Sequence, residues 1–249
     1  MTRDLILAIE TSNPSARTSP GPVRPGIAVG RLGPHGIRLL ARREIDPGHP
    51  HDDSLLPAID AAFRSIAAPP AALARVAVSI GPGGYTAVRL AVTAAMMIAE
   101  ATGAQCVPVP TASVVARRVT HGPLPFAVLL ASKGDSAFAT VFDADRPADA
   151  GRLVRPADIA ALRVRRLIAD SFLPEAIRLA AGGVPIEPPV FDPAACLELA
   201  IDFDPVDPMA LRPRYPREPE AVTRWRELHP PDRGAGGSDP TTDAVRSGP

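Results

Sequence analysis

The amino-acid sequence predicts an α/β fold with two lobes, mixed sheets and a second lobe that is reduced relative to the first. In the first half, apolar runs and helical patterns follow one another in the order strand-strand-strand-helix-strand-helix-strand. After Gly122-Pro123 the pattern starts again, but its segments are shorter and prolines interrupt them. Residues 232–249 contain almost no apolar side chains, which predicts a disordered tail. We therefore expect a first lobe at 1–110, a second at 111–231 and a tail at 232–249.

The first half contains the elements of one complete lobe. The expected strands cover 4–10, 27–32, 37–44, 75–80 and 105–109, and the expected helices cover 55–66, 86–102 and 111–119. The turn at 33–36 joins the second and third strands, so the first three strands should form an antiparallel meander. This order is that of a ribonuclease-H-like half, the unit that is duplicated in actin-like ATPases.

The second half has the pattern of an incomplete repeat. Residues 126–131 and 137–142 predict a hairpin, and 166–170 predict a further strand. Short helices are expected at 156–162 and 173–181.

Composition limits the classes of function. The chain has 27 basic and 27 acidic residues, so no excess of positive charge favours autonomous nucleic-acid binding. The two cysteines, Cys106 and Cys196, form no CxxC motif, and we expect a reducing, cytoplasmic compartment. The apolar runs are too short for a membrane span, so we expect a soluble protein that does not contact membranes.

Residues 8–12 form the first candidate site, a strand that ends in a carboxylate followed by two hydroxyls. Glu10 could hold a metal-bound water, while Thr11 and Ser12 could bind phosphate oxygens. Alternatively, the two hydroxyls end the strand and begin a turn. The turn contains no glycine, and this favours the second interpretation.

A glycine loop forms the second candidate site, between a strand and a helix. Gly81, Gly83 and Gly84 would let an anion approach backbone amides at the helix N-terminus. Thr86 and Arg89 belong to the same candidate group. However, the lysine of a P-loop is missing, and the loop is equally consistent with a tight connection in which Thr86 caps the helix.

The histidines give no sign of a metal centre. No HxxxH or HExxH pair occurs, and no GxSxG motif marks a nucleophile. We therefore expect neither a metal site nor a catalytic residue in this chain.

The helix at 86–102 is apolar on all sides, so it should be covered on all sides. It could be a core helix between two layers, or a partner subunit could cover one side. For the second case the candidate interface residues are Val88, Val92, Met96 and Ala99, together with Leu55 and Ile59 of the preceding helix.

Four segments resemble the TsaB (YeaZ) family, which takes part in the synthesis of threonylcarbamoyladenosine in tRNA. Residues 5–12 (LILAIETS) match the opening strand ILAIDTS, and 51–59 (HDDSLLPAI) match the first helix. Residues 81–91 (GPGGYTAVRLA) match GPGSFTGLRIG, the most distinctive family segment. Within that segment Ala87 and Ala91 replace family glycines. Residues 213–222 (PRYPREPEAV) resemble the closing tyrosine-arginine segment.

The resemblance implies a two-lobed, actin-like subunit without independent catalysis. Such a subunit associates with the catalytic TsaD and the ATPase TsaE, or with itself when TsaD is absent. The complex uses ATP and transfers threonylcarbamoyl to N6 of adenosine 37, so tRNA would be contacted only through the complex and the chain alone would bind no cofactor. The alternative is an actin-like ATPase or kinase that binds Mg-ATP at Glu10 and the glycine loop.

Overall fold

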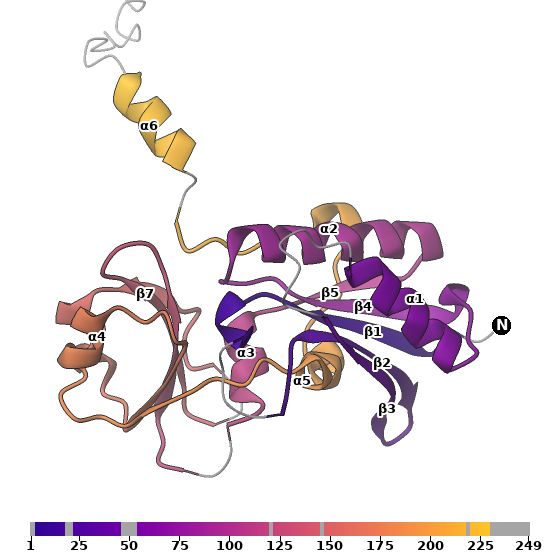
Figure 1. Cartoon of the computed structure of the whole chain (residues 1–249), viewed down its shortest axis with the longest axis horizontal. Helices are drawn as coiled ribbons and strands as arrows, with labels where there is room; N and C mark the ends of the chain where they lie inside the picture. The colour runs from indigo at the N-terminus through magenta and orange to yellow at the C-terminus, as the bar shows by residue number, and fades with distance from the viewer. Residues whose placement is uncertain are drawn as a thin grey trace, which may run out of the picture. The chain divides into compact units, whose positions relative to one another are not determined.

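The computed structural model describes residues 3–17, 22–45, 54–119, 122–144, 147–217 and 220–229. The chain divides into two compact units, Met1–Pro216 and Arg217–Pro249. The first unit contains two five-stranded sheets (Figure 1). The second contains one described helix, α6 (Glu220–Leu228). The tail predicted at 232–249 lies outside the described residues.

The first sheet is mixed, as predicted. Its strands are β1 (Leu5–Glu10), β2 (Gly26–Gly33), β3 (Gly36–Glu44), β4 (Leu73–Ser79) and β5 (Gln105–Val109). They lie in the order β3-β2-β1-β4-β5. The meander β1-β2-β3 is antiparallel, which confirms the prediction, whereas β4 and β5 run parallel to β1.

Helices cover both faces of this sheet. On one face lie α1 (Leu55–Ser65) and α2 (Tyr85–Thr102), and on the other lies α5 (Pro193–Glu198) (Figure 1). The side chains of β1 alternate between the two layers: Leu5, Leu7 and Ile9 join the core under α1 and α2, while Ile6 and Ala8 join the core under α5. All of β1 is therefore buried, which explains why its sequence is apolar without alternation.

The second sheet repeats the strand order of the first. Its strands are β6 (Phe126–Ala131), β7 (Ala137–Phe142), β8 (Arg152–Val154), β9 (Arg166–Ala169) and β10 (Ile186–Glu187). The order is β10-β9-β6-β7-β8, with β6-β7-β8 antiparallel and β9 and β10 parallel to β6. This confirms the mixed second sheet. The short β8 and β10 were not predicted.

The elements that cover the second sheet are short. Two 3-10 turns, η3 (Pro156–Asp158) and η4 (Ala160–Leu162), replace the helix predicted at 156–162, and α4 (Glu175–Ala180) has six residues. The remaining short turns of the first unit are η1 (Pro14–Arg17), η2 (Pro70–Ala72), η5 (Leu199–Ile201) and η6 (Pro208–Ala210). Within the described ranges, no helix combines the length and apolar character that crossing a membrane requires.

Two short helices connect the sheets. α3 (Thr111–Ala116) follows β5 but packs on Phe126, Val128 and Leu130 of β6, and α5 follows β10 but packs on the first sheet. Asp192 caps α5 through the Ala194 amide and also accepts from Arg118 at 2.7 Å. Residues 193–201 therefore lie against the first sheet, although we placed all of 111–231 in the second lobe.

Candidate functional site

The carboxyl end of β1 is a buried polar cluster. Glu10 is fully buried, and its Oε1 accepts hydrogen bonds from the Ser12 amide (2.9 Å) and the Ser12 hydroxyl (2.7 Å). Ser79, at the end of β4, shares a 2.8 Å hydrogen bond with the Thr111 hydroxyl. Burial raises the pKa of the Glu10 carboxyl, and the hydrogen bonds from Ser12 only partly oppose this. The Ser12 hydroxyl thus binds Glu10 within the chain, while Thr11 is partly exposed.

The glycine loop packs directly against this cluster. The Gly84 amide donates to the Ser12 carbonyl oxygen at 2.7 Å, and a Cβ added at Gly83 would lie 2.1 Å from that oxygen. Gly81 has a φ of +98°, and its carbonyl accepts from the Thr111 amide at 3.1 Å. Because glycines have no side chain, the two loops can contact each other here. The glycines therefore have a role in packing.

Two predicted residues of the loop differ in role from our expectation. The N-cap of α2 is Gly84, and it makes no side-chain capping hydrogen bond, so Thr86 does not cap the helix but lies exposed in its first turn. Arg89 is exposed and donates to the Tyr85 hydroxyl at 3.2 Å. Among the described residues, no hydrogen bond joins the Thr86 or Arg89 side chain to Glu10 or Ser12.

A hydrogen-bonded carboxylate links the two sheets, and sequence reasoning missed it. Asp170, just after β9, is buried and accepts from the Asn13 side-chain amide at 3.1 Å and the Ala131 amide at 2.8 Å through one oxygen. Its other oxygen accepts from the Phe172 amide at 2.9 Å. A polar pair 157 positions apart leaves no local signal, although Asn13 follows one predicted strand and Asp170 ends another.

The burial of α2 corrects the predicted interface. Val88, Val92 and Ala99 are buried in the core beneath the helix, as are Leu55 and Ile59 of α1, and Met96 is only partly exposed. Five of these six residues therefore belong to the core cluster, and Met96 packs against it. α2 has both this core side and an exposed side, and both sides carry apolar residues. The exposed side consists of other residues.

Large apolar side chains gather on the exposed side of α1 and α2. Met97 is 65% exposed and Leu56 is 58% exposed, and Leu90 of the same α2 side is also exposed. At the N-terminal end of α2, the Tyr85 ring packs on Tyr215 with a centroid distance of 5.2 Å. We call Leu56, Tyr85, Leu90 and Met97 the docking face.

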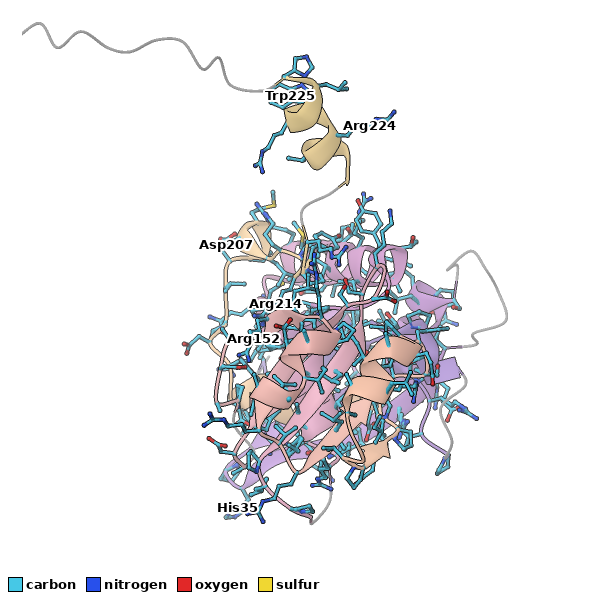
Figure 2. The ribbon with its side chains drawn as sticks, turned by 90° about the vertical axis from the view of Figure 1, so that its left-hand side faces the viewer. His35, Arg152, Asp207, Arg214, Arg224 and Trp225 are labelled. Carbon is cyan, nitrogen blue, oxygen red and sulfur yellow. The ribbon has the colours of Figure 1, made fainter. Side chains whose placement is uncertain are left out.

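Charged and aromatic groups border the docking face at its Tyr85 end. The Arg89 guanidinium lies over the Tyr85 ring, 5.1 Å from its centroid. Burial and the neighbouring Tyr85 raise the pKa of the Tyr215 hydroxyl, and Arg89 opposes that shift. The guanidinium of Arg214, labelled in Figure 2, instead lies over the Phe138 ring and donates to the Ala150 carbonyl.

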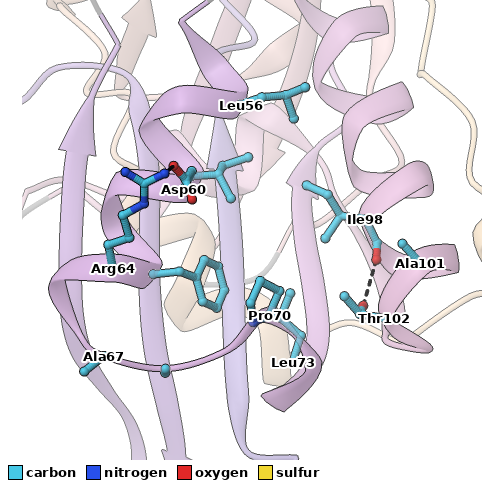
Figure 3. Close-up of a pocket in the computed structure, with 12 residues that line it drawn as sticks. Leu56, Asp60, Arg64, Ala67, Pro70, Leu73, Ile98, Ala101 and Thr102 are labelled. Carbon is cyan, nitrogen blue, oxygen red and sulfur yellow. Dashed lines mark hydrogen bonds and ion pairs between the residues drawn. The ribbon is translucent and has the colours of Figure 1, made fainter.

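An apolar groove lies between α1 and α2, with a cavity volume of about 410 Å³ (Figure 3). Leu56 and Phe63 of α1 and Ile98 and Ala101 of α2 line it, while Asp60 and Arg64 form an ion pair at its edge. Within the described ranges, no group of three or more His, Cys, Asp or Glu side chains is placed to hold a metal ion. His49 and His51 lie outside those ranges.

Comparisons with known proteins agree on one family. The model of the TsaD family, described as tRNA N6-adenosine threonylcarbamoyltransferase, matches residues 47–187, more than half of the chain. A search among curated proteins gives no match.

Two solved structures share the fold. YeaZ from Pseudomonas aeruginosa superposes with a TM-score of 0.61 at 19% identity, covering 86% of this chain and 100% of that one. An uncharacterised protein with similarity to peptidase YeaZ, from the same organism, gives a TM-score of 0.57 at 19% identity, covering 87% and 100%. The actin-like, ribonuclease-H-like architecture expected from the element order is thus confirmed. The chain belongs to the TsaD family of tRNA-modification proteins, and its fold is like that of YeaZ.

Proposed function

We propose that this chain is a partner subunit in the synthesis of threonylcarbamoyladenosine in tRNA, without a catalytic centre of its own. It docks on a catalytic TsaD subunit, works with the ATPase TsaE, and supports transfer of threonylcarbamoyl to N6 of adenosine 37. The observation that carries the proposal is the docking face, because large apolar side chains remain exposed there after the core beneath α1 and α2 is complete.

The composition of the docking face supports a protein partner. Single exposed apolar residues are common on any surface, but here Leu56 lies on α1, while Leu90 and Met97 share one side of α2. Tyr85 and Arg89 lie at the N-terminal end of α2. Methionine, tyrosine and arginine are enriched at protein interfaces. In this proposal Thr86 and Arg89, which the sequence suggested as anion ligands, lie at the margin of the docking face.

The runner-up, a kinase or ATPase, has less support. It requires Glu10 and the glycine loop to face bound Mg-ATP, yet Glu10 is fully buried and the Ser12 carbonyl lies against Gly83 and Gly84. In the proposal the complex consumes ATP, this chain alone binds no cofactor, and tRNA contacts the complex. The balanced net charge of the chain agrees with that division.

The test is reconstitution with the TsaD, TsaE and tRNA of the same organism. We expect no modified adenosine from this chain alone, modification when all components are present, and at least a tenfold lower rate with Leu90→Glu, since a charge buried at an interface without a partner is costly. Turnover by the isolated chain, or micromolar Mg-ATP binding that Glu10→Ala abolishes, would favour the runner-up instead.

A further inference from the structure

The outer edge of the first sheet, along β3, is free in the described part of the chain. β3 is the terminal strand in the order β3-β2-β1-β4-β5, and Figure 1 shows it at the margin of the sheet. It has nine residues, and no described strand or isolated bridge pairs with the side that faces away from β2. At the opposite edge, by contrast, Val206 forms a bridge with Cys106 of β5. The outward backbone N–H and C=O groups of β3 can therefore pair with one further strand.

One face of this edge is basic. Arg43 lies opposite Ile27, whose side chain belongs to the core under α1 and α2, so Arg43 lies on that face of the sheet. Arg31 follows Ile27 by four positions and lies on the same face, and Arg38 is directly opposite Arg31. Arg31 forms an ion pair with Asp4 at 3.2 Å, whereas Arg43 donates only to a backbone carbonyl. Within the described ranges the Arg38 and Arg43 guanidinium groups have no carboxylate partner.

The other face of the same edge is apolar at its exposed centre. Leu39 lies opposite Gly30, and a Cβ added at Gly30 would meet a leucine of α5, so both residues lie on the face that α5 covers. Leu39 is nevertheless 47% exposed. Arg42, further along this face, already pairs with Asp192 at 3.5 Å, and Glu44 is the last residue of the strand. The β3 edge thus presents arginines without carboxylate partners on one face and an exposed leucine on the other.

We propose that the β3 edge binds an extended segment of another protein in which acidic and apolar residues alternate. The segment adds a strand to the first sheet, with its carboxylates beside Arg38 and Arg43 and its apolar side chains beside Leu39. Opposite charges on directly opposed residues stabilise a strand pair, and like charges destabilise it. A second copy of β3 would set arginine against arginine, so the arginines that oppose self-association also select an acidic partner. The proposal does not depend on the proposed function, because it uses neither the docking face nor TsaD.

A labelled peptide tests for binding to the full-length chain. The probe is a fluorescein-labelled peptide of the same length as β3, in which Glu and Val alternate, and binding is followed by fluorescence anisotropy. We expect saturable binding with a Kd below about 1 mM. A peptide of the same composition with its Glu residues in one block loses the alternation and should bind at least about fivefold more weakly. No binding of the alternating peptide up to about 1 mM overturns the proposal.

Charge reversal tests the basic face. Arg38→Glu changes an exposed side chain, so the fold should survive, and it should weaken binding of the Glu-Val peptide at least about fivefold. The same variant should bind a Lys-Val peptide more tightly than the parent protein does, because the charges are then opposite again. Arg163→Glu, at an exposed arginine that follows η4, is the matched control and should leave binding unchanged. Equal binding of the Glu-Val peptide by Arg38→Glu and the parent overturns the proposal.

Methylation of the peptide nitrogens separates strand pairing from simple charge attraction. Successive N–H groups of a strand point to opposite edges, so methylation of every Glu nitrogen blocks one edge of the peptide and methylation of every Val nitrogen blocks the other. We expect one of these two peptides to bind like the unmethylated peptide and the other to bind at least about tenfold more weakly. Equal binding of both, or displacement of the probe by single-stranded RNA as readily as by the unlabelled peptide, indicates a general anion-binding surface and overturns the proposal.

Discussion

The two sheets have the same strand order, but their helices differ in length. In the first sheet, α1 and α2 have 11 and 18 residues. At the corresponding positions of the second sheet stand the turns η3 and η4 and the six-residue α4. The strands shorten as well, since β3 has nine residues and its counterpart β8 has three. One architecture therefore occurs twice, with long covering helices only once.

The difference indicates where a partner can bind. The short elements of the second sheet use Ile159, Leu162 and Ile177 to cover β6 and β9, so these side chains lie in the core. By contrast, α2 is long enough to fill the core on one side and present Leu90 and Met97 on the other. The long helices of the first repeat thus cover the sheet and also expose apolar side chains to a partner. Leu179 of α4, 73% exposed, and Phe172 before it, 56% exposed, are exceptions, and Leu179 serves below as a control.

The largest change in stability is expected at Asp170, which ties the second sheet to the first. Asp170→Ala leaves Asn13 and the amides of Ala131 and Phe172 without their acceptor. At about 1–3 kcal/mol for each of these three groups, the free energy of unfolding should fall by at least about 3 kcal/mol in denaturant titrations. Asp135→Ala, at an exposed carboxylate in the β6–β7 turn, should change it little. Equal losses from both would mean that Asp170 does not join the sheets.

A smaller loss is expected at the glycine loop, which has no glycine counterpart after β9. Gly83→Ala places a Cβ against the Ser12 carbonyl oxygen, so one of the two loops must move. We expect the free energy of unfolding to fall by about 2–3 kcal/mol. Gly33→Ala, whose Cβ would have ordinary contacts only, is the matched control. A Gly83→Ala variant as stable as Gly33→Ala would show that the loops are not in close contact.

The smallest effect is expected at Glu10, and it depends on pH. Burial raises the pKa of this carboxyl above 4.5, so the folded chain holds the proton more tightly than the unfolded chain. The stability from this difference is complete below about pH 4.5 and is lost as pH rises through the folded pKa, with a slope of at most about 1.4 kcal/mol per pH unit.

Glu10→Gln should remove this dependence, because an amide stays neutral. We expect the variant to match the parent near pH 4.5 and to be more stable than the parent near pH 8. Parallel profiles for Glu10→Gln and the parent protein would contradict the raised pKa.

Most of the fold could be predicted from sequence, because local patterns specify it. The hairpin strands β6 and β7 have the predicted limits, and α1 and α2 begin within one residue of the predictions. The exchange of α3 and α5 between the sheets was not predictable in the same way. Six-residue helices have too few turns to show a periodicity, and their partners are set by contacts distant in sequence.

The candidate site was only partly predictable. The sequence pointed to α2 as an interface but to Val88, Val92 and Ala99 on its core side. A helix with valine, alanine, leucine and methionine on every side gives no amphipathic signal, so sequence alone cannot tell its core side from its exposed side. Sequence reasoning treated the Glu10 segment and the glycine loop as two separate candidates, and the structure brings them into contact through the Gly84 amide and the Ser12 carbonyl oxygen.

The central claim is that the exposed side of the first repeat, and not the second, binds the partner. The most direct test is the affinity of the chain for the TsaD of the same organism, measured by calorimetry with Met97→Glu and Leu179→Glu, each at a highly exposed apolar position where folding should survive. The account predicts that Met97→Glu weakens binding by more than tenfold and that Leu179→Glu leaves it unchanged. Unchanged binding by Met97→Glu, or loss confined to Leu179→Glu, would contradict it.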